Sequence, residues 1–434
     1  MPIRHLSWFS IFRLGTVQLC LGAIVVLMTS TLNRLMVVEL MLPAVLPGAL
    51  VAFHYGVQIT RPNWGYRSDT SGNRTRWVII GMGMLAVGAL MAAFAIPLLE
   101  ASFWTGLLIS IVAYGMIGMG VGASGTSLLA LMATATEERR RPAAASITWL
   151  MMILGIAATA ITVGQVLDPY SHERMLAIVA VVVSGAFAVT CIAIWGIERR
   201  AGVQAAPLAE PMRFLDGLRE IWAERAARNF TFFVFLSMTA YFMQELIMEP
   251  FAGLVFQMTP GQTTSMSGAQ SGGVLLGMVL VGVAATGLRL GALRSWVIAG
   301  CLGSAATLAA LVFIATGGLQ PLLLPGVITL GFFNGMFAVA AIGAMMQLAG
   351  QGRARREGTR MGLWGAAQAI AAGFGGLFGA ALADITRKAL GSDAHAFGTV
   401  FTIEAALFLA SAFVALRVME GRRPTARAGL VPGE

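Results

Sequence analysis

Residues 65–74 read Gly-Tyr-Arg-Ser-Asp-Thr-Ser-Gly-Asn-Arg and connect two long apolar runs. Gly65 and Gly72 predict a tight turn, because glycine accepts backbone conformations that other residues avoid. Asp69 can pair with an arginine or cap a neighbouring helix, and Arg74 adds a basic group at the end of the stretch. A short polar turn between apolar runs predicts two membrane helices that are latched together at one face of a membrane.

The composition of the whole chain agrees with a location in lipid. Hydrophobic residues make up 57% of the 434 residues and charged residues 11%, whereas soluble domains average about 25% charged. The mean hydropathy is +0.79, so the chain lacks the polar side chains that a water-facing surface needs. Large soluble domains are therefore excluded, and an all-α membrane protein is predicted.

The apolar runs have the lengths of membrane helices, since about 20 residues cross the hydrocarbon core. They predict twelve spans, which puts both chain termini on one side of the membrane. The spans are expected at roughly 12–32, 43–60, 77–98, 103–132, 143–167, 175–197, 229–252, 267–288, 295–316, 321–349, 361–384 and 396–418.

The basic residues divide unevenly between the two sides of the predicted membrane. Of the 29 Lys and Arg residues, only Arg34, Arg174, Arg387 and Lys388 fall on one side, which leaves 25 on the other. The positive-inside rule places the richer side, and with it both termini, in the cytoplasm. Because the net charge of +9 is then mostly topological, we expect contact with anionic membrane lipids and no nucleic-acid partner.

A polar bridge at 199–228 divides the chain. It separates an N-terminal half at 1–198 from a C-terminal half at 229–418, which is followed by a cytoplasmic tail at 419–434. Apolar residues of the bridge share one helical face and predict an amphipathic helix on the cytoplasmic membrane surface. These residues are Leu215, Leu218, Ile221 and Trp222.

The two halves repeat each other in sequence. Residues 77–81, Trp-Val-Ile-Ile-Gly, recur at 296–300 as Trp-Val-Ile-Ala-Gly, displaced by 219 positions. An arginine cluster precedes Trp149 in the first half and Trp364 in the second, and these tryptophans are displaced by 215. Because both matches fall at equivalent connections with nearly equal offsets, we predict a duplication of six spans with a cleft between the halves.

The spacing of Gly65, Asp69, Gly72 and Arg74 resembles the signature loop of the major facilitator superfamily. This resemblance implies the fold of that superfamily, with twelve transmembrane helices in two six-helix, pseudo-symmetric halves and both termini cytoplasmic. The corresponding stretch of the second half, 289–294, lacks the aspartate. We therefore expect an asymmetric cytoplasmic latch, which weighs against an ordinary alternating-access antiporter.

More specific strings cover nearly the whole chain, at 29–34, 37–40, 42–44, 53–58, 61–62, 140–144, 149–153, 244–245 and 248–253. Together they resemble the PucC/LhaA family of phototrophic bacteria. The resemblance implies a multi-pass factor of the bacterial inner membrane that assists the assembly of light-harvesting antennas. Its implied ligand is bacteriochlorophyll a, bound transiently, and its implied partners are antenna α/β polypeptides and bacteriochlorophyll synthase.

His54 is the only histidine inside a predicted span. A magnesium chlorin needs one axial ligand and a large apolar groove, and a neutral imidazole nitrogen can supply that ligand. Phe53 and Tyr55 offer rings for packing, and Gln58 offers a hydrogen bond to a pigment carbonyl. The alternatives are that His54 bonds to another helix and that the magnesium takes water or a backbone carbonyl. No metal site of the protein's own is expected.

Carboxylates at membrane depth need an explanation, because an Asp at a helix centre costs about 2.5 to 3.5 kcal/mol on insertion. Glu245 and Glu249 lie four residues apart and share one helical face, just ahead of Pro250, where we expect the helix to break. The pair either hydrogen-bonds to neighbouring helices or lines the mouth of the cleft and binds a polar ligand edge or a proton. Glu404 lies alone in the last span and is expected to bond to a polar group on another helix.

Three further polar residues, Asn33, Arg34 and Glu39, stand at the end of the first predicted span. An ion pair between Arg34 and Glu39 would fix the periplasmic turn that follows. Together with Glu245 and Glu249, these three residues are the polar residues that we expect to line the cleft.

Small residues are dense in two spans, where Gly118 and Gly122, and Gly375 and Gly379, match the Gly-x-x-x-Gly pattern of close helix contacts. Packing inside the bundle is one interpretation. Docking of a single-span antenna polypeptide on such a face is the other.

Missing motifs exclude several enzymes and pumps. Prenyl-transferring synthases use closely spaced aspartates to hold magnesium diphosphate, and the closest aspartates here, Asp384 and Asp393, are nine positions apart. Lys388 is the sole lysine, so no ATP-binding Gly-x-x-x-x-Gly-Lys loop exists. We therefore expect a non-enzymatic carrier or chaperone. The alternative is a facilitator-type secondary transporter of a tetrapyrrole or another small amphipathic solute.

Overall fold

The computed structural model describes residues 6–70, 73–137, 140–198, 225–288, 290–350 and 357–418, and nearly all of them are helical. The first half contains α1 (Trp8–Val26, continued by π-helical turns at Leu27–Leu32 and Leu35–Glu39), α2 (Val45–Val57), α3 (Arg61–Thr70), α4 (Arg74–Ala101), α5 (Phe103–Ala135), α6 (Arg141–Leu167) and α7 (His172–Ile194). The second half contains α10 (Arg225–Phe256), α11 (Pro260–Val281, continued by a π-helical turn at Gly282–Gly287), α12 (Leu293–Thr316), α13 (Leu323–Gly350), α14 (Glu357–Leu390) and α15 (Asp393–Val418).

Within the described ranges, eleven helices are long and apolar enough to cross a membrane. The shorter apolar helix Val45–Thr60 corresponds to the second of the twelve predicted spans. The prediction of an all-α membrane protein is therefore confirmed. The predicted bridge at 199–228 lies outside the described residues up to 224, including its amphipathic residues, and its last four residues belong to α10. The C-terminal tail at 419–434 also lies outside the described residues.

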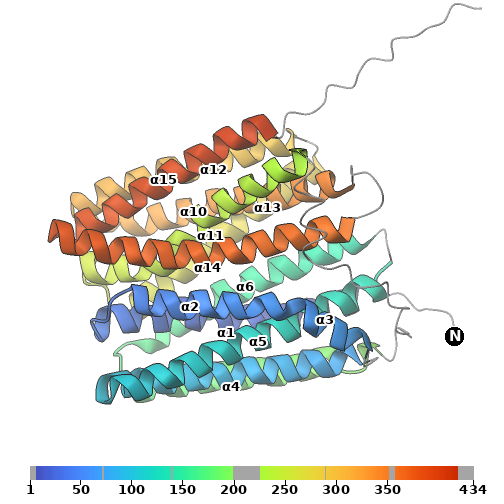
Figure 1. Ribbon diagram of the computed structural model, residues 1–434, viewed down its shortest axis with the longest axis horizontal. Helices are drawn as coiled ribbons and strands as arrows, with labels where there is room; N and C mark the ends of the chain where they lie inside the picture. Colours follow the sequence, from blue (N-terminus) through green and yellow to red (C-terminus); the bar gives the residue numbers. More distant parts are fainter. Residues whose placement is uncertain are drawn as a thin grey trace, which may run out of the picture.

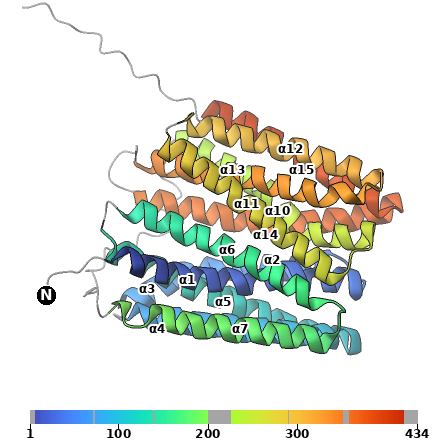
Figure 2. The same ribbon diagram turned by 180° about the vertical axis from the view of Figure 1, so that it is seen from behind.

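The helices form two bundles that lie alongside each other, α1–α7 in one and α10–α15 in the other (Figure 1). Each bundle buries an apolar core of its own. The bundles meet where α6 packs on α11 and where α2 packs on α14. Helix α1 begins and α15 ends at the same end of the molecule (Figure 2). That this end faces the cytoplasm stays a prediction from charge.

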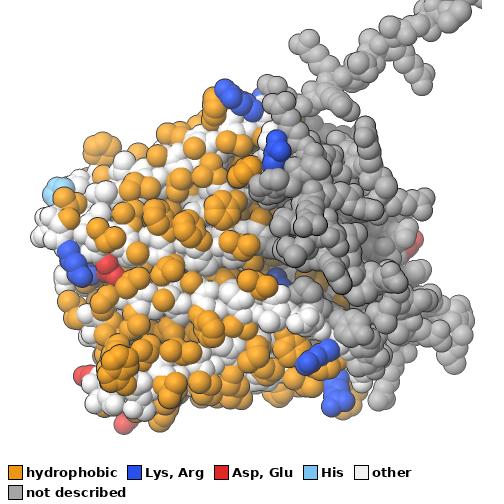
Figure 3. All heavy atoms as spheres, viewed as in Figure 1, with side chains coloured by type: hydrophobic (Ala, Val, Ile, Leu, Met, Phe, Trp, Pro, Cys, Tyr) orange, Lys and Arg blue, Asp and Glu red, His pale blue; other side chains and the backbone are white. Residues whose placement is uncertain are grey.

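The described surface is suited to lipid. On the face shown in Figure 3, hydrophobic side chains cover the middle of the bundle, and charged side chains gather towards its two ends. Exposed apolar side chains such as Val181, Ile192 and Phe313 are more than 70% accessible. In a membrane these positions contact hydrocarbon rather than water, so their exposure carries no hydrophobic penalty.

The stretch that resembles the signature loop is largely helical. The prediction of a tight turn at Gly65 is therefore wrong. Residues Arg61–Thr70 form α3, which includes Gly65 and Asp69, whereas Gly72 lies outside the described residues. Pro62 stands in the first turn of α3. A proline there favours a helix, because its backbone angle is already helical and its missing N–H would have no partner within the helix.

A residue that the sequence did not single out holds the start of α4. The carboxylate of Glu198 accepts hydrogen bonds from the backbone N–H groups of Arg74 and Thr75, each at 2.8 Å. The guanidinium of Arg74 donates to the hydroxyl of Thr134 on α5 at 2.5 Å. Glu198 therefore caps a helix N-terminus, the role that a carboxylate is suited to by charge.

The two Gly-x-x-x-Gly pairs face other helices of the protein itself. A Cβ atom on Gly375 would lie 2.6 Å from a backbone carbonyl oxygen of α10, and one on Gly379 would lie 2.8 Å from another. A Cβ atom on Gly118 would lie 2.6 Å from a backbone carbonyl oxygen of α2, and one on Gly122 would lie 3.4 Å from the ring of Trp64. The packing interpretation is confirmed, and these faces are not free for an antenna polypeptide.

Gly375→Ala is expected to lower the free energy of unfolding by about 1 to 3 kcal/mol, because the added methyl group overlaps the backbone of α10. Gly185→Ala in α7 is the matched control. Nothing lies within 4 Å of the Cβ position of Gly185, so this change should leave stability unchanged or raise it slightly. Thermal unfolding of both variants in detergent tests the difference, and equal shifts would contradict close packing of α14 on α10.

Candidate functional site

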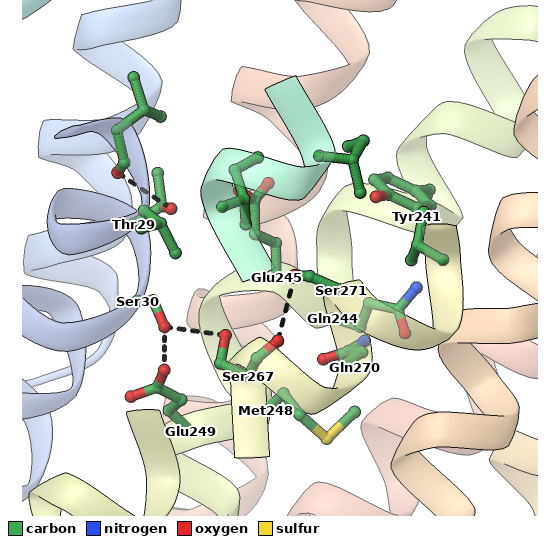
Figure 4. A pocket seen from close by; sticks show the side chains of 15 residues that line it. Thr29, Ser30, Tyr241, Gln244, Glu245, Met248, Glu249, Ser267, Gln270 and Ser271 are labelled. Carbon is green, nitrogen blue, oxygen red and sulfur yellow. Dashed lines mark hydrogen bonds between the residues drawn. The ribbon is translucent and has the colours of Figure 1, made fainter. Parts of the chain in front are cut away.

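A cavity of about 100 Å³ lies between the two halves (Figure 4). Its walls come from α1 and the π-helical turn that follows it, from α6, and from α10 and α11, so both halves contribute. The polar residues that line it are Thr29, Ser30, Tyr241, Gln244, Glu245, Glu249, Ser267, Gln270 and Ser271. The cavity is therefore small, polar and placed where the sequence repeat predicts a cleft.

Glu245 and Glu249 both line this cavity, in agreement with their predicted position on one face of a helix. Oε1 of Glu249 accepts a hydrogen bond from the hydroxyl of Ser30, which belongs to the other half. The same hydroxyl lies 2.9 Å from Oγ of Ser267 on α11. Glu249 thus forms a hydrogen bond with a neighbouring helix and also lines a cavity. Its side chain is buried inside the protein and is not at an open mouth of the cleft.

The π-helical turn at Leu27–Leu32 positions the first half's contribution. A π-helical turn widens the helix and changes the direction of its side chains, and such turns occur often at functional sites. Here the turn directs Thr29 and Ser30 into the cavity. Thr31 lies on the same turn, and its hydroxyl is 3.4 Å from that of Thr264 on α11.

Helix α10 continues through Pro250 to Phe256, so the predicted break at Pro250 is wrong. Proline has no N–H, which leaves the carbonyl oxygen four residues earlier, that of Leu246, without its usual helical partner. The side-chain nitrogen of Asn33 donates to this oxygen at 2.7 Å. An amide from the other half therefore supplies the hydrogen bond that the proline removes, and the helix can continue in lipid.

The predicted ion pair between Arg34 and Glu39 is present. Arg34 is 2% exposed, and its second terminal nitrogen donates to the backbone oxygen of Met258 at 2.8 Å. Met258 lies between α10 and α11 in the other half. The pair thus holds its own turn and also fastens one half to the other, which sequence reasoning missed.

Two aspartates join the halves at the end opposite to the chain termini. Asp168, which follows α6, accepts hydrogen bonds from the hydroxyl of Thr259 and from the N–H of Gly261 (3.0 Å) at the start of α11. Asp384 of α14 accepts from two N–H groups at the start of α2, at 3.0 and 2.8 Å. These N–H groups have no partner within their helices, so a carboxylate is favourable there. We call the two contacts the aspartate latches.

His54 is buried, and its Nε2 lies 2.8 Å from the side-chain nitrogen of Gln58. Arg61 donates to the amide oxygen of Gln58, which turns the amide nitrogen towards His54. Nε2 therefore accepts, and Nδ1 carries the ring proton and has no partner among the described residues. In this arrangement neither ring nitrogen has a lone pair free for magnesium.

The four pigment candidates do not converge on one surface. Phe53 is 44% exposed on the outer face of the bundle, whereas His54 and Gln58 are buried. The ring of Tyr55 packs edge-on against Phe242 of the second half, with centroids 5.8 Å apart. None of the four lines the cavity between the halves.

Glu404 is fully buried in the second half, and neither carboxylate oxygen has a hydrogen-bond partner among the described residues. The expectation that a polar group on another helix satisfies it is therefore wrong. Glu404 lies outside the cavity.

The chain is similar to proteins of phototrophic bacteria. Residues 31–423 match the sequence model of the family described as PUCC protein. The chain is 64% identical over 429 residues to the "Bacteriochlorophyll synthase 44.5 kDa chain" of Rhodobacter capsulatus, which covers 98% of this chain and 99% of that protein. It is 28% identical over 449 residues to "Protein PucC" of Cereibacter sphaeroides, with 96% and 93% covered.

Solved structures of transporters share the fold. The nucleoside transporter NupG superposes with a TM-score of 0.70 at 15% identity, covering 97% of this chain and 100% of that one. A bacterial homologue of the lysosomal transporter Spinster, inward-facing and unoccupied, superposes with a TM-score of 0.69 at 13% identity, covering 95% and 97%. The fold predicted from the signature loop, that of the major facilitator superfamily, is confirmed.

Proposed function

The chain belongs to the PUCC protein family, and from this premise we propose that it assists the assembly of light-harvesting antenna complexes in a bacterial inner membrane. It binds or delivers bacteriochlorophyll a, holds nascent antenna α/β polypeptides, or does both. The observation that carries the proposal is the 64% identity, over nearly the full length of both chains, to a protein named as a chain of bacteriochlorophyll synthase.

The proposed role is carriage rather than catalysis. Solved structures that share this fold include transporters of nucleosides and peptides. The sequence also lacks the closely spaced aspartates that a prenyl-transferring synthase needs. The synthase name of the relative therefore fits a protein that exchanges pigment with that enzyme, and we propose the synthase as a partner.

The pigment does not fit the cavity in this arrangement of the halves. Pockets for drug-sized ligands have volumes of about 300 to 1,000 Å³, whereas this cavity has about 100 Å³. Bacteriochlorophyll binding therefore requires either that the halves separate or that the pigment lies on the lipid-facing surface, where Phe53 is exposed. Ligation by His54 requires that Gln58 first release Nε2.

Protein purified in mild detergent from a pigment-producing phototroph is expected to show near-infrared bacteriochlorophyll bands at a near-equimolar ratio. His54→Ala should keep these bands, because both ring nitrogens are already engaged or protonated. Gln58→Ala is the companion variant, since it frees Nε2. Loss of the bands in His54→Ala, with stronger bands in Gln58→Ala, would instead assign His54 as the magnesium ligand. A colourless, folded protein would contradict pigment carriage and leave the holding of antenna polypeptides. A deletion strain with normal antenna levels would contradict the whole proposal.

A second candidate function is facilitated transport of a tetrapyrrole or another small amphipathic solute. The observation that favours it is the cavity between two halves that are latched at one end, as an alternating-access carrier requires. Transport predicts that the solute accumulates in vesicles that contain the protein. An assembly factor predicts instead that pigment and antenna polypeptides copurify with it.

A further inference from the structure

Glu249 lies within a cluster of oxygen atoms that pigment carriage does not explain. Its side chain is 2% exposed, and Oε2 has no hydrogen-bond partner among the described residues, although Oε1 accepts from Ser30. On α11, the hydroxyls of Thr263, Thr264 and Ser267 are close enough to interact with the carboxylate. Oxygen atoms from both halves therefore converge on one buried carboxylate with an unused acceptor.

Among the described residues, no Lys, Arg or His side chain forms an ion pair with this carboxylate. Among the described residues that line the cavity, none is Lys, Arg or His. Arg34 attracts Glu249 from a distance, but its guanidinium is already bonded to Glu39 and to the backbone of Met258. A carboxylate removed from water without a partner is strongly unfavourable, so it takes up a proton or a positively charged ligand. The surrounding hydroxyls distinguish these two outcomes.

We propose that Glu249 and the hydroxyls of Ser30, Thr263, Thr264 and Ser267 bind a sodium ion between the two halves. These five side chains offer oxygen atoms, which hard cations prefer as ligands. A single carboxylate with neutral hydroxyls matches one positive charge, whereas calcium takes six to eight oxygens and magnesium keeps several waters. A proton needs one oxygen only, so it does not account for hydroxyls that converge from both halves.

Glu245 is the second carboxyl group of the cavity and lies one helical turn from Glu249. Its side chain interacts with the hydroxyl of Thr29 instead of the hydroxyl cluster, so we assign the ion to Glu249. Because Ser30 belongs to the first half and the other ligands to the second, a bound sodium ion stabilises the arrangement of the halves seen here. The inference is independent of pigment carriage, since it concerns a cavity that is too small for a tetrapyrrole.

The test is binding of radioactive ²²Na⁺ to the full-length protein, purified in detergent without pigment and with choline replacing sodium at constant ionic strength. We expect saturable binding that unlabelled sodium displaces and choline does not. Glu249→Gln and Ser267→Ala should each weaken the affinity about tenfold or more. Glu404→Gln is the matched control, because Glu404 is an equally buried carboxyl outside the cavity, and it should bind sodium normally.

Three results would overturn the inference. Sodium binding that is unchanged in Glu249→Gln would place the ion elsewhere. Displacement by micromolar calcium would assign a divalent site. Absence of sodium binding, with thermal stability that depends on pH in the wild type but not in Glu249→Gln, would show that a proton alone occupies the carboxylate. None of these results affects the copurification of bacteriochlorophyll, so the two proposals fail separately.

Discussion

Replacing Asp168 and Asp384 together with asparagine is expected to lower the free energy of unfolding by about 3 to 6 kcal/mol. Each carboxylate accepts two hydrogen bonds from the start of a helix in the other half. An asparagine amide has one acceptor oxygen and turns an NH₂ group towards donors, so each latch loses at least one bond to a charged acceptor, worth about 1.5 to 3 kcal/mol. Each single variant should lose about half, because the latches share no residue.

The double variant is also expected to open the latched end. A loss of about 3 kcal/mol corresponds to roughly a hundredfold shift in an equilibrium between closed and open forms. A reporter cysteine at Met248, which lines the cavity, should then react faster with a membrane-impermeant thiol reagent, in a chain whose three native cysteines are replaced. Asp393→Asn is the matched control, because Asp393 pairs with Arg387 of its own half. Equal labelling rates in the two variants would exclude the aspartate latches as a gate.

The aspartate latches occupy equivalent positions in the two halves. Asp168 and Asp384 are 216 positions apart, between the displacements of 215 and 219 found in the sequence repeat. The latched end has therefore kept the symmetry of the duplication, whereas at the other end the stretch 289–294 has lost the aspartate. Symmetric latches allow the two halves to separate as rigid bodies at this end. This arrangement suits a carrier with two states better than a static scaffold.

The spans and the duplication are predictable from the sequence because their signals are local. Apolar length determines which segments can cross a membrane, and the repeat is visible in short strings such as 77–81 and 296–300. The shared face of Glu245 and Glu249 follows from helical spacing. The ion pair of Arg34 and Glu39 is predictable because its partners are close in the sequence, five residues apart at the end of a span.

The contacts between the halves are not predictable in this way, because they join residues that lie between 91 and 340 positions apart. Sequence spacing gives no reason to pair Ser30 with Glu249. The prediction about Glu404 failed for a related reason: it assumed a partner from burial alone, while both carboxylate oxygens lack one among the described residues. For Asp168 and Asp384 a signal did exist, since their separation matches the repeat, but it does not reveal which helix each one caps.

Asn33→Ala is expected to destabilise the protein by about 3 kcal/mol, because it leaves the carbonyl oxygen of Leu246 without a donor at membrane depth. The destabilisation arises because Pro250 has no N–H to donate to this oxygen. It does not arise merely because the side-chain amide of Asn33 is removed. The cost should therefore depend on what occupies position 250. Denaturant titration in detergent micelles measures the free energy of unfolding of each variant.

In a Pro250→Ala background, the backbone N–H at position 250 can donate to Leu246 as in an ordinary helix, so Asn33→Ala should then cost less than about 1 kcal/mol. The difference between the two backgrounds is the coupling energy of the pair, expected at about 2 kcal/mol. Asn334→Ala is the matched control: its amide is buried and bonded to Ser304 within the second half, so its cost should be the same in both backgrounds. If Asn33→Ala costs as much with alanine at 250 as with proline, then Asn33 acts only as a general contact between the halves. If the cost disappears, a side chain of the first half completes a helix of the second, and α10 can form its full length only when the two halves are together.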